Sequence, residues 1–267
     1  MFQITIPFLY LFAGGALALS RLPQHESRSG SLVAAGFALC GVGVLLHIWL
    51  LTTAMMPGGA GLTMATAVSL IGLQLAAIAG LSAINENLRG LAGGMLLLGA
   101  LCAMATGTGD VATGKSAMTW QIRIHVLTSM FAYGLLTVGT IVAVYALVQD
   151  NRLRGGKLTA ANRLFAPLDI TEKLLFALTA AGFTVLALSV VSGFTFVEDL
   201  FAQHLVHKTI LSLVAVLLFG VLLGGRWLAG WRGRRAVYLY LSAFTALGLG
   251  YFGSRVILEE VLGRSWG

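Results

Sequence analysis

The chain has 267 residues, of which 58% are hydrophobic and 10% are charged, and its formal net charge at pH 7 is +7. Together with a mean hydropathy of +0.90, this composition excludes an ordinary soluble protein and indicates an integral membrane protein without a separate soluble domain. The apolar runs are of helix-spanning length and lack the ten-residue alternation of barrel strands, which excludes a transmembrane β-barrel.

We predict an all-α fold: a polytopic transmembrane helical bundle of about eight helices, forming a single integral membrane domain over residues 1–267. The predicted spans lie near residues 4–21, 31–53, 62–82, 89–107, 120–148, 171–193, 204–229 and 234–256. The first four helices fall within residues 1–110, and the last four form a core over residues 120–256.

The basic residues predict the orientation, because cytoplasmic loops retain Lys and Arg during insertion. One side carries twelve of the 17 basic residues: Arg21, Arg28, Arg89, Arg152, Arg154, Lys157, Arg163, Lys173, Arg226, Arg232, Arg234 and Arg235. The other side carries Lys115, Arg123, Lys208, Arg255 and Arg264. We therefore expect both termini to face outward. Topology and contact with the lipid bilayer account for the positive charge, so no nucleic-acid partner is implied.

The two cysteines, Cys40 and Cys102, stand alone in different predicted helices. They form no Cys-x-x-Cys or Cys-x-x-Cys-His motif, so we expect small buried side chains and neither a redox pair nor a covalent haem attachment. Glycines follow no phosphate-binding pattern, and neither a nucleophile elbow nor His-Glu-x-x-His occurs. The sequence therefore signals no catalytic residues and no nucleotide-driven pump.

Four of the five histidines lie toward the same predicted outer side of the membrane: His47, His125, His204 and His207. At 1.5 Å per residue, His47 should lie roughly 9 Å, His125 roughly 8 Å and His207 about 5 Å below the outer boundary. Imidazoles inside a membrane must offset their desolvation, so the cluster is a candidate functional site. The alternative is a set of interfacial histidines that bond to lipid or backbone, which applies most to His204.

Two cations accompany these histidines: Arg123 lies beside His125, and Lys208 follows His207. Imidazole ligates haem iron axially, and Arg or Lys pairs with anionic propionates. We predict that His125 and His207 ligate haem b, that both cations bias the propionates outward, and that His47 lines the pocket or acts as a transfer ligand.

Copper or zinc is the alternative metal for the same histidines. The predicted helices offer no thiolate pair or facing carboxylates at that depth, which disfavours a mononuclear site. Copper remains an alternative because three methionines lie nearby in the predicted arrangement: Met55, Met56 and Met118.

The second half of the chain resembles the polytopic cytochrome c assembly proteins of the CcsA and CcmC type, and most closely their short YpjD- and HemX-like branch. The resemblance covers residues 120–256 well and the first four helices by general pattern. It is carried by Arg123-Ile124-His125-Val126-Leu127, Ala132-Tyr133-Gly134-Leu135-Leu136, Pro167-Leu168 with Glu172, Gly182-Phe183-x-x-Leu186-x-Leu188, Gly193, His207-Lys208-Thr209-Ile210, Gly230-Trp231-Arg232-Gly233-Arg234-Arg235-Ala236 and Tyr251-Phe252-Gly253-Ser254-Arg255.

The resemblance implies a haem-binding or haem-handling protein of the bacterial inner membrane, in which His125 stands where the synthases carry an outer-side haem ligand. The synthases also have a tryptophan-rich segment before the penultimate helix and a second outer histidine near the last helix. Neither is present in residues 194–203 or 255–267 of this chain, so His207 must supply a second ligand, with His47 as the alternate. The other interpretations are a non-catalytic regulatory or partner subunit of a membrane complex and a proton-coupled transporter of another small substrate.

Overall fold

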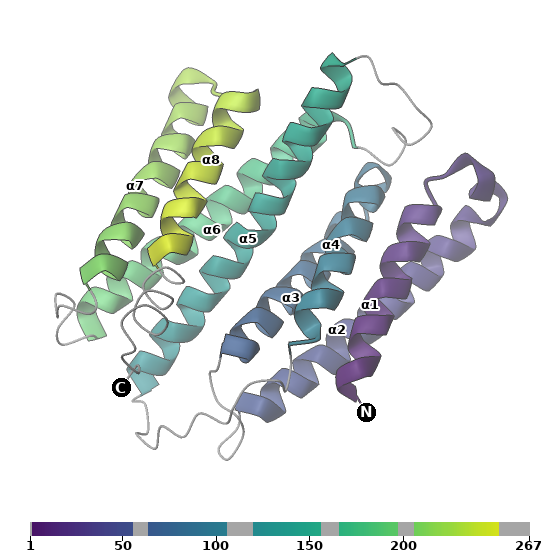
Figure 1. Ribbon diagram of the computed structural model, residues 1–267, viewed down its shortest axis with the longest axis horizontal. Coiled ribbons are helices and arrows are strands. Elements are labelled where there is room, and N and C mark those ends of the chain that lie inside the picture. The colour runs from purple at the N-terminus through teal and green to yellow at the C-terminus, as the bar shows by residue number, and fades with distance from the viewer. Residues whose placement is uncertain (1, 56–63, 106–119, 156–165, 197–205, 251–267) are drawn as a thin grey trace. The chain divides into compact units, whose positions relative to one another are not determined.

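The computed structural model describes residues 2–55, 64–105, 120–155, 166–196 and 206–250, and these carry eight α-helices (Figure 1). The helices are α1 (Phe2–Leu19), α2 (Ser29–Met55), α3 (Met64–Ser82), α4 (Arg89–Ala103), α5 (Trp120–Arg154), α6 (Leu168–Phe196), α7 (Val206–Ala229) and α8 (Gly233–Gly248). Two short 3-10 helices, η1 (Pro23–Arg28) and η2 (Glu86–Leu88), precede α2 and α4.

Hydropathy explains why these segments are helical, since a backbone in lipid must satisfy its hydrogen bonds internally. Helices α2, α3, α5, α6 and α7 are long and apolar enough to cross a membrane, and α1 carries a shorter apolar stretch. Within the described residues, α4 has 15 residues and α8 has 16. The predicted polytopic helical bundle is confirmed.

Several helix ends differ from the predicted ones. Helix α5 continues to Arg154, six residues beyond the expected end, and α6 begins at Leu168, three residues early. The extension of α5 contains an exposed ion pair one turn apart, between Asp150 and Arg154 at 3.0 Å, which supports a solvated last turn. Helix α4 ends at Ala103, before the expected residue 107. Hydropathy therefore predicts the position of the apolar centre of a helix more accurately than it predicts where the helix ends.

Contacts divide the chain into two compact units: residues 1–117 with 145–174 form unit 1, and residues 118–144 with 175–267 form unit 2. In unit 1, α1 packs against α2 and α4, and α3 packs against α4 and α2. Each of these four helices therefore packs against two of the others. The end of α5 and the start of α6 belong to the same unit.

Small residues bring the helices of unit 1 close together. A Cβ at Gly14 of α1 would lie 2.8 Å from the carbonyl oxygen of Gly93 in α4, and one at Gly72 of α3 would lie 3.0 Å from that of Gly99. Association between helices in lipid depends on van der Waals contact, which small residues allow the backbones to make. A larger side chain at any of these four positions would force the helices apart.

Unit 2 consists of most of α5 and α6 together with α7 and α8. Phe176 of α6 lies 4.6 Å beneath the guanidinium of Arg226 in α7, and a Cβ at Gly220 of α7 would lie 3.6 Å from Phe183 of α6. Since residue numbers rise along α6 as they fall along α7, these two helices are antiparallel. The start of α7 thus lies at the same end of unit 2 as the end of α6.

Helix α8 is fixed to α5 by two tyrosines. The buried Tyr240 hydroxyl donates to the Leu136 carbonyl at 2.7 Å, and the Tyr133 hydroxyl donates to the Leu247 carbonyl at 3.3 Å. A Cβ at Gly139 would overlap the Tyr240 hydroxyl. Glycine at this position therefore lets the tyrosine reach a backbone carbonyl deep in the bundle.

Candidate functional site

His125 lies in the second turn of α5, five residues after the helix begins at Trp120, and its side chain is half-buried. Its Nδ1 lies 2.9 Å from the Ser192 hydroxyl of α6. That hydroxyl donates its only proton to the Ser189 carbonyl at 2.7 Å. We infer from this that Ser192 accepts from Nδ1 of His125, which leaves the lone pair on Nε2.

This tautomer has a chemical consequence. A metal-binding histidine typically uses one ring nitrogen as the ligand while the other donates to a protein acceptor, which fixes the orientation of the ring. In His125 it is Nδ1 that contacts Ser192, and the inferred tautomer leaves Nε2 as the nitrogen that could bind a metal. The site therefore presents an oriented, half-buried imidazole with an available lone pair.

A further hydrogen bond, between Ser129 and Ser189, holds this part of α5 against α6. The Ser129 hydroxyl donates to the His125 carbonyl at 2.8 Å and lies 2.5 Å from the Ser189 hydroxyl. A Cβ at Gly193 would lie 3.0 Å from Cε1 of the His125 ring. Glycine thus leaves room for the ring beside α6, in the orientation that the serines set.

Three other predicted members of this site, His207, Lys208 and Arg123, lie at the same end of unit 2. His207 and Lys208 are the second and third residues of α7, and Arg123 is in the first turn of α5. Antiparallel packing of α5, α6 and α7 brings these helix starts to one end. The structure describes the backbones of these three residues and not their side chains. His204 lies outside the described residues.

His47 lies in α2 of unit 1, eight residues before the helix ends at Met55, or about 12 Å from that end. Its ring is fully buried and both nitrogens are engaged: Nδ1 with the Tyr10 hydroxyl at 3.1 Å and Nε2 with the Ser69 hydroxyl at 2.7 Å. His47 would have to exchange one of these bonds to act as a ligand. Its bonds join α1, α2 and α3.

Sequence reasoning did not identify the partners of the histidines. Ser189 and Ser192 are ordinary small residues in an apolar helix, and Tyr10 and Ser69 are separated in sequence from His47 by 37 and 22 positions. The one available signal was the spacing of Ser189 and Ser192, which places both on one face of α6. Within the described parts of the chain, no group of three or more His, Cys, Asp or Glu side chains could hold a metal ion.

Unit 1 also contains a buried amide that the sequence did not mark. Gln74 of α3 is 6% exposed, and neither its oxygen nor its nitrogen has a hydrogen-bond partner among the described residues. An amide buried in this way costs free energy unless water or a ligand satisfies it.

Comparison with known proteins places this arrangement in context. The model of the family described as "Cytochrome C assembly protein" matches residues 3–262. The inner membrane protein YpjD of Escherichia coli K12 is 33% identical over 138 residues, which are 52% of this chain and 52% of that protein. An uncharacterised 28.8 kDa protein of Azospirillum brasilense, from a nifR3-like 5′ region, is 28% identical over 172 residues, 63% of each chain.

The matched segment spans about half the length of the YpjD proteins. No solved structure matches the chain. The family match includes the first four helices, in which the resemblance to the family noted from the sequence was only a general pattern.

Proposed function

Because the chain belongs to the cytochrome c assembly protein family, we propose that it is a haem-handling protein related to cytochrome c biogenesis. It is a multi-pass protein of the bacterial inner membrane. The observation that supports a haem site most directly is the contact between Nδ1 of His125 and the Ser192 hydroxyl, from which we infer a free lone pair on Nε2. Haem iron accepts axial imidazole nitrogen donors, and the porphyrin of haem carries two anionic propionates.

In this proposal His125 of α5 and His207 of α7 provide the two ligands of a bis-histidine site for haem b. Arg123 and Lys208 pair with the propionates and bias them toward the outer, periplasmic face. For His47, which the sequence predicted as a pocket residue or transfer ligand, binding haem requires that it give up its bond to Ser69 or Tyr10. The protein holds and presents haem, and none of these residues needs to make or break a covalent bond.

An absorption spectrum of the detergent-purified protein, before and after dithionite, tests the haem site. We expect a Soret band and a low-spin reduced spectrum. His125→Ala or His207→Ala should remove or convert the low-spin signal, whereas His204→Ala should cost little. His25→Ala is the matched control, because His25 lies in the short helix η1 of unit 1, on the side that the basic residues predict to be cytoplasmic. A double His125→Ala/His207→Ala variant with full haem content and an unaltered spectrum would show that the site is wrong.

The same preparation separates the alternative functions. A regulatory or partner subunit would co-purify with another membrane protein in fixed ratio and without pigment. A proton-coupled carrier of another substrate would show neither pigment nor a stoichiometric partner. Either result, in protein purified from cells supplied with haem, would count against haem handling.

The proposed outward orientation has its own test. With Cys40 and Cys102 replaced, single cysteines at positions 116 and 156 should react with an impermeant maleimide from the periplasmic and cytoplasmic sides, respectively. The expectation follows from the excess of basic residues in the loops on one side. Reversed labelling would place the histidines on the cytoplasmic side and remove the outward-facing site.

A further inference from the structure

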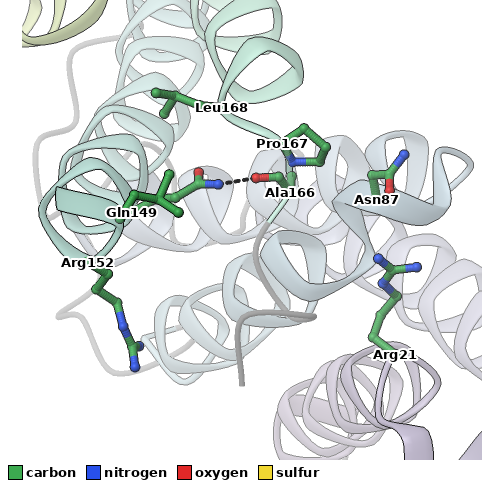
Figure 2. A pocket seen from close by; sticks show the side chains of 8 residues that line it. Arg21, Asn87, Gln149, Arg152, Ala166, Pro167 and Leu168 are labelled. Atoms are coloured by element: carbon green, nitrogen blue, oxygen red, sulfur yellow. Dashed lines mark hydrogen bonds between the residues drawn. The ribbon is translucent and has the colours of Figure 1, made fainter. Parts of the chain in front are cut away.

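A polar cavity lies at the basic end of unit 1, at the opposite end of its helices from His47. Its volume is about 350 Å³, within the range of small-ligand pockets. Its lining comes from segments far apart in sequence: Arg21, Asn87, Gln149, Arg152, Leu153, Ala166, Pro167 and Leu168. The seven side chains labelled in Figure 2 come from the turn after α1, from η2, from the end of α5 and from the segment that leads into α6. All eight residues belong to the same compact unit.

Two polar atoms of this lining are buried without a partner among the described residues. They are Nε of Arg21 and Oε1 of Gln149. Gln149 is 6% exposed, and its Nε2 donates to the Ala166 carbonyl (Figure 2), which fixes which end of the amide remains free. The cavity thus offers a cationic donor and a buried acceptor. Leaving such groups without partners is costly, so a ligand that satisfies both is expected.

The chemistry of the lining selects the ligand. It contains the guanidinium groups of Arg21 and Arg152 and none of the eight lining residues is acidic, which favours an anion. The free Gln149 oxygen requires a donor from the same ligand, such as a hydroxyl group. Leu153, Pro167 and Leu168 add an apolar part to the lining. A phosphodiester that carries a hydroxylated headgroup and an apolar tail meets all three conditions.

We propose that this cavity binds the headgroup of an anionic, hydroxyl-bearing phospholipid, with the phosphate on Arg21 and a headgroup hydroxyl on Gln149. The same end of unit 1 also carries Arg28, Arg89 and Arg154, as expected where a membrane protein meets anionic lipid of the cytoplasmic leaflet. This site is separate from the proposed haem site and does not depend on it. The free anion glycerol 3-phosphate shares the phosphate and hydroxyl chemistry, so the test includes it.

The test uses the full-length protein in a neutral detergent. Dioleoyl phosphatidylglycerol is titrated against the thermal unfolding midpoint, with dioleoyl phosphatidylcholine and glycerol 3-phosphate as parallel titrations. Native mass spectrometry of the wild-type protein, in an equal mixture of the two lipids, gives a second measurement that needs no variant. We expect a saturable rise in the midpoint and retained adducts with phosphatidylglycerol alone.

Arg21→Gln should weaken the response to phosphatidylglycerol about tenfold, as expected when a charge-assisted hydrogen bond is lost. The matched control is Arg28→Gln, which removes the same charge from an exposed position in η1 outside the cavity and should leave the response within about twofold of wild type.

Equal binding of the two lipids would overturn the proposal. So would equal weakening by Arg21→Gln and Arg28→Gln, since diffuse charge alone would then explain the binding. A full response to glycerol 3-phosphate at the same concentration would assign the cavity to a free anion and reject the lipid. If Arg21→Gln does not fold, selective phosphatidylglycerol adducts on the wild type support the proposal, and unselective adducts reject it. None of these measurements depends on the haem spectrum or haem content, so a negative result for this lipid site would not count against the proposed haem-handling function.

Discussion

Replacing Ser192 by alanine removes a hydroxyl that accepts from Nδ1 of His125 at 2.9 Å and donates to the Ser189 carbonyl at 2.7 Å. The ring then loses the acceptor that fixes its orientation and its tautomer. Loss of such a partner typically lowers metal affinity about 10- to 100-fold. This corresponds to about 1.4 to 2.8 kcal/mol of binding free energy. Ser192→Ala should therefore raise the Kd for haem by that factor without changing the helix content.

The assay is a haem titration of the purified apo-protein, followed at the Soret band, with circular dichroism as the check on folding. Ser242→Ala is the matched control, because Ser242 donates to the Tyr238 carbonyl at 2.9 Å from an exposed face of α8. Its Kd should stay within about twofold of wild type, as usual for surface substitutions. A Ser192→Ala variant that binds haem as tightly as wild type would refute the tautomer argument. Equal losses in both variants would assign the effect to general destabilisation.

Four further substitutions test the structure by unfolding in denaturant. Gln74→Leu should stabilise the protein by about 1 to 3 kcal/mol, since it removes an unsatisfied buried amide; a destabilised variant would mean that a water or ligand satisfies it. Gly139→Ala should cost about 1 to 3 kcal/mol through overlap with Tyr240, whereas Gly15→Ala, with open space around it, should be neutral or better. Lys173→Ala, which removes an exposed ion pair with Asp169, should change stability by less than about 0.5 kcal/mol.

The sequence predicted the helices well because membrane insertion imposes a long apolar run on each of them. It predicted their ends less well. The last turn of α5 is polar and lies beyond the apolar run, yet it is helical and carries the Asp150–Arg154 pair. Local side-chain pairs of this kind leave no trace in average hydropathy.

For the candidate site, the sequence placed His125 near the start of a helix, and the structure agrees. The sequence could not predict the role of Ser192, because the His125 tautomer is inferred from hydrogen bonds that involve atoms of both α5 and α6. His47 shows the opposite case: its depth suggested a ligand, while Tyr10 and Ser69 occupy both of its nitrogens. The cavity at Arg21 was also missed, since its lining comes from four separate segments.

The division of α5 and α6 between the two units has a consequence for synthesis of the protein. Unit 1 ends with residues 145–174, although it begins with residues 1–117. The ribosome therefore releases helices α1 to α4 well before the rest of their own unit exists. The cavity that includes Arg21 stays incomplete until Leu168 has been made. Contacts between such distant residues form late and slowly. Expression of residues 1–117 as a separate fragment should therefore give a bundle with one end uncovered, whereas a fragment that ends after residue 174 contains every segment of unit 1.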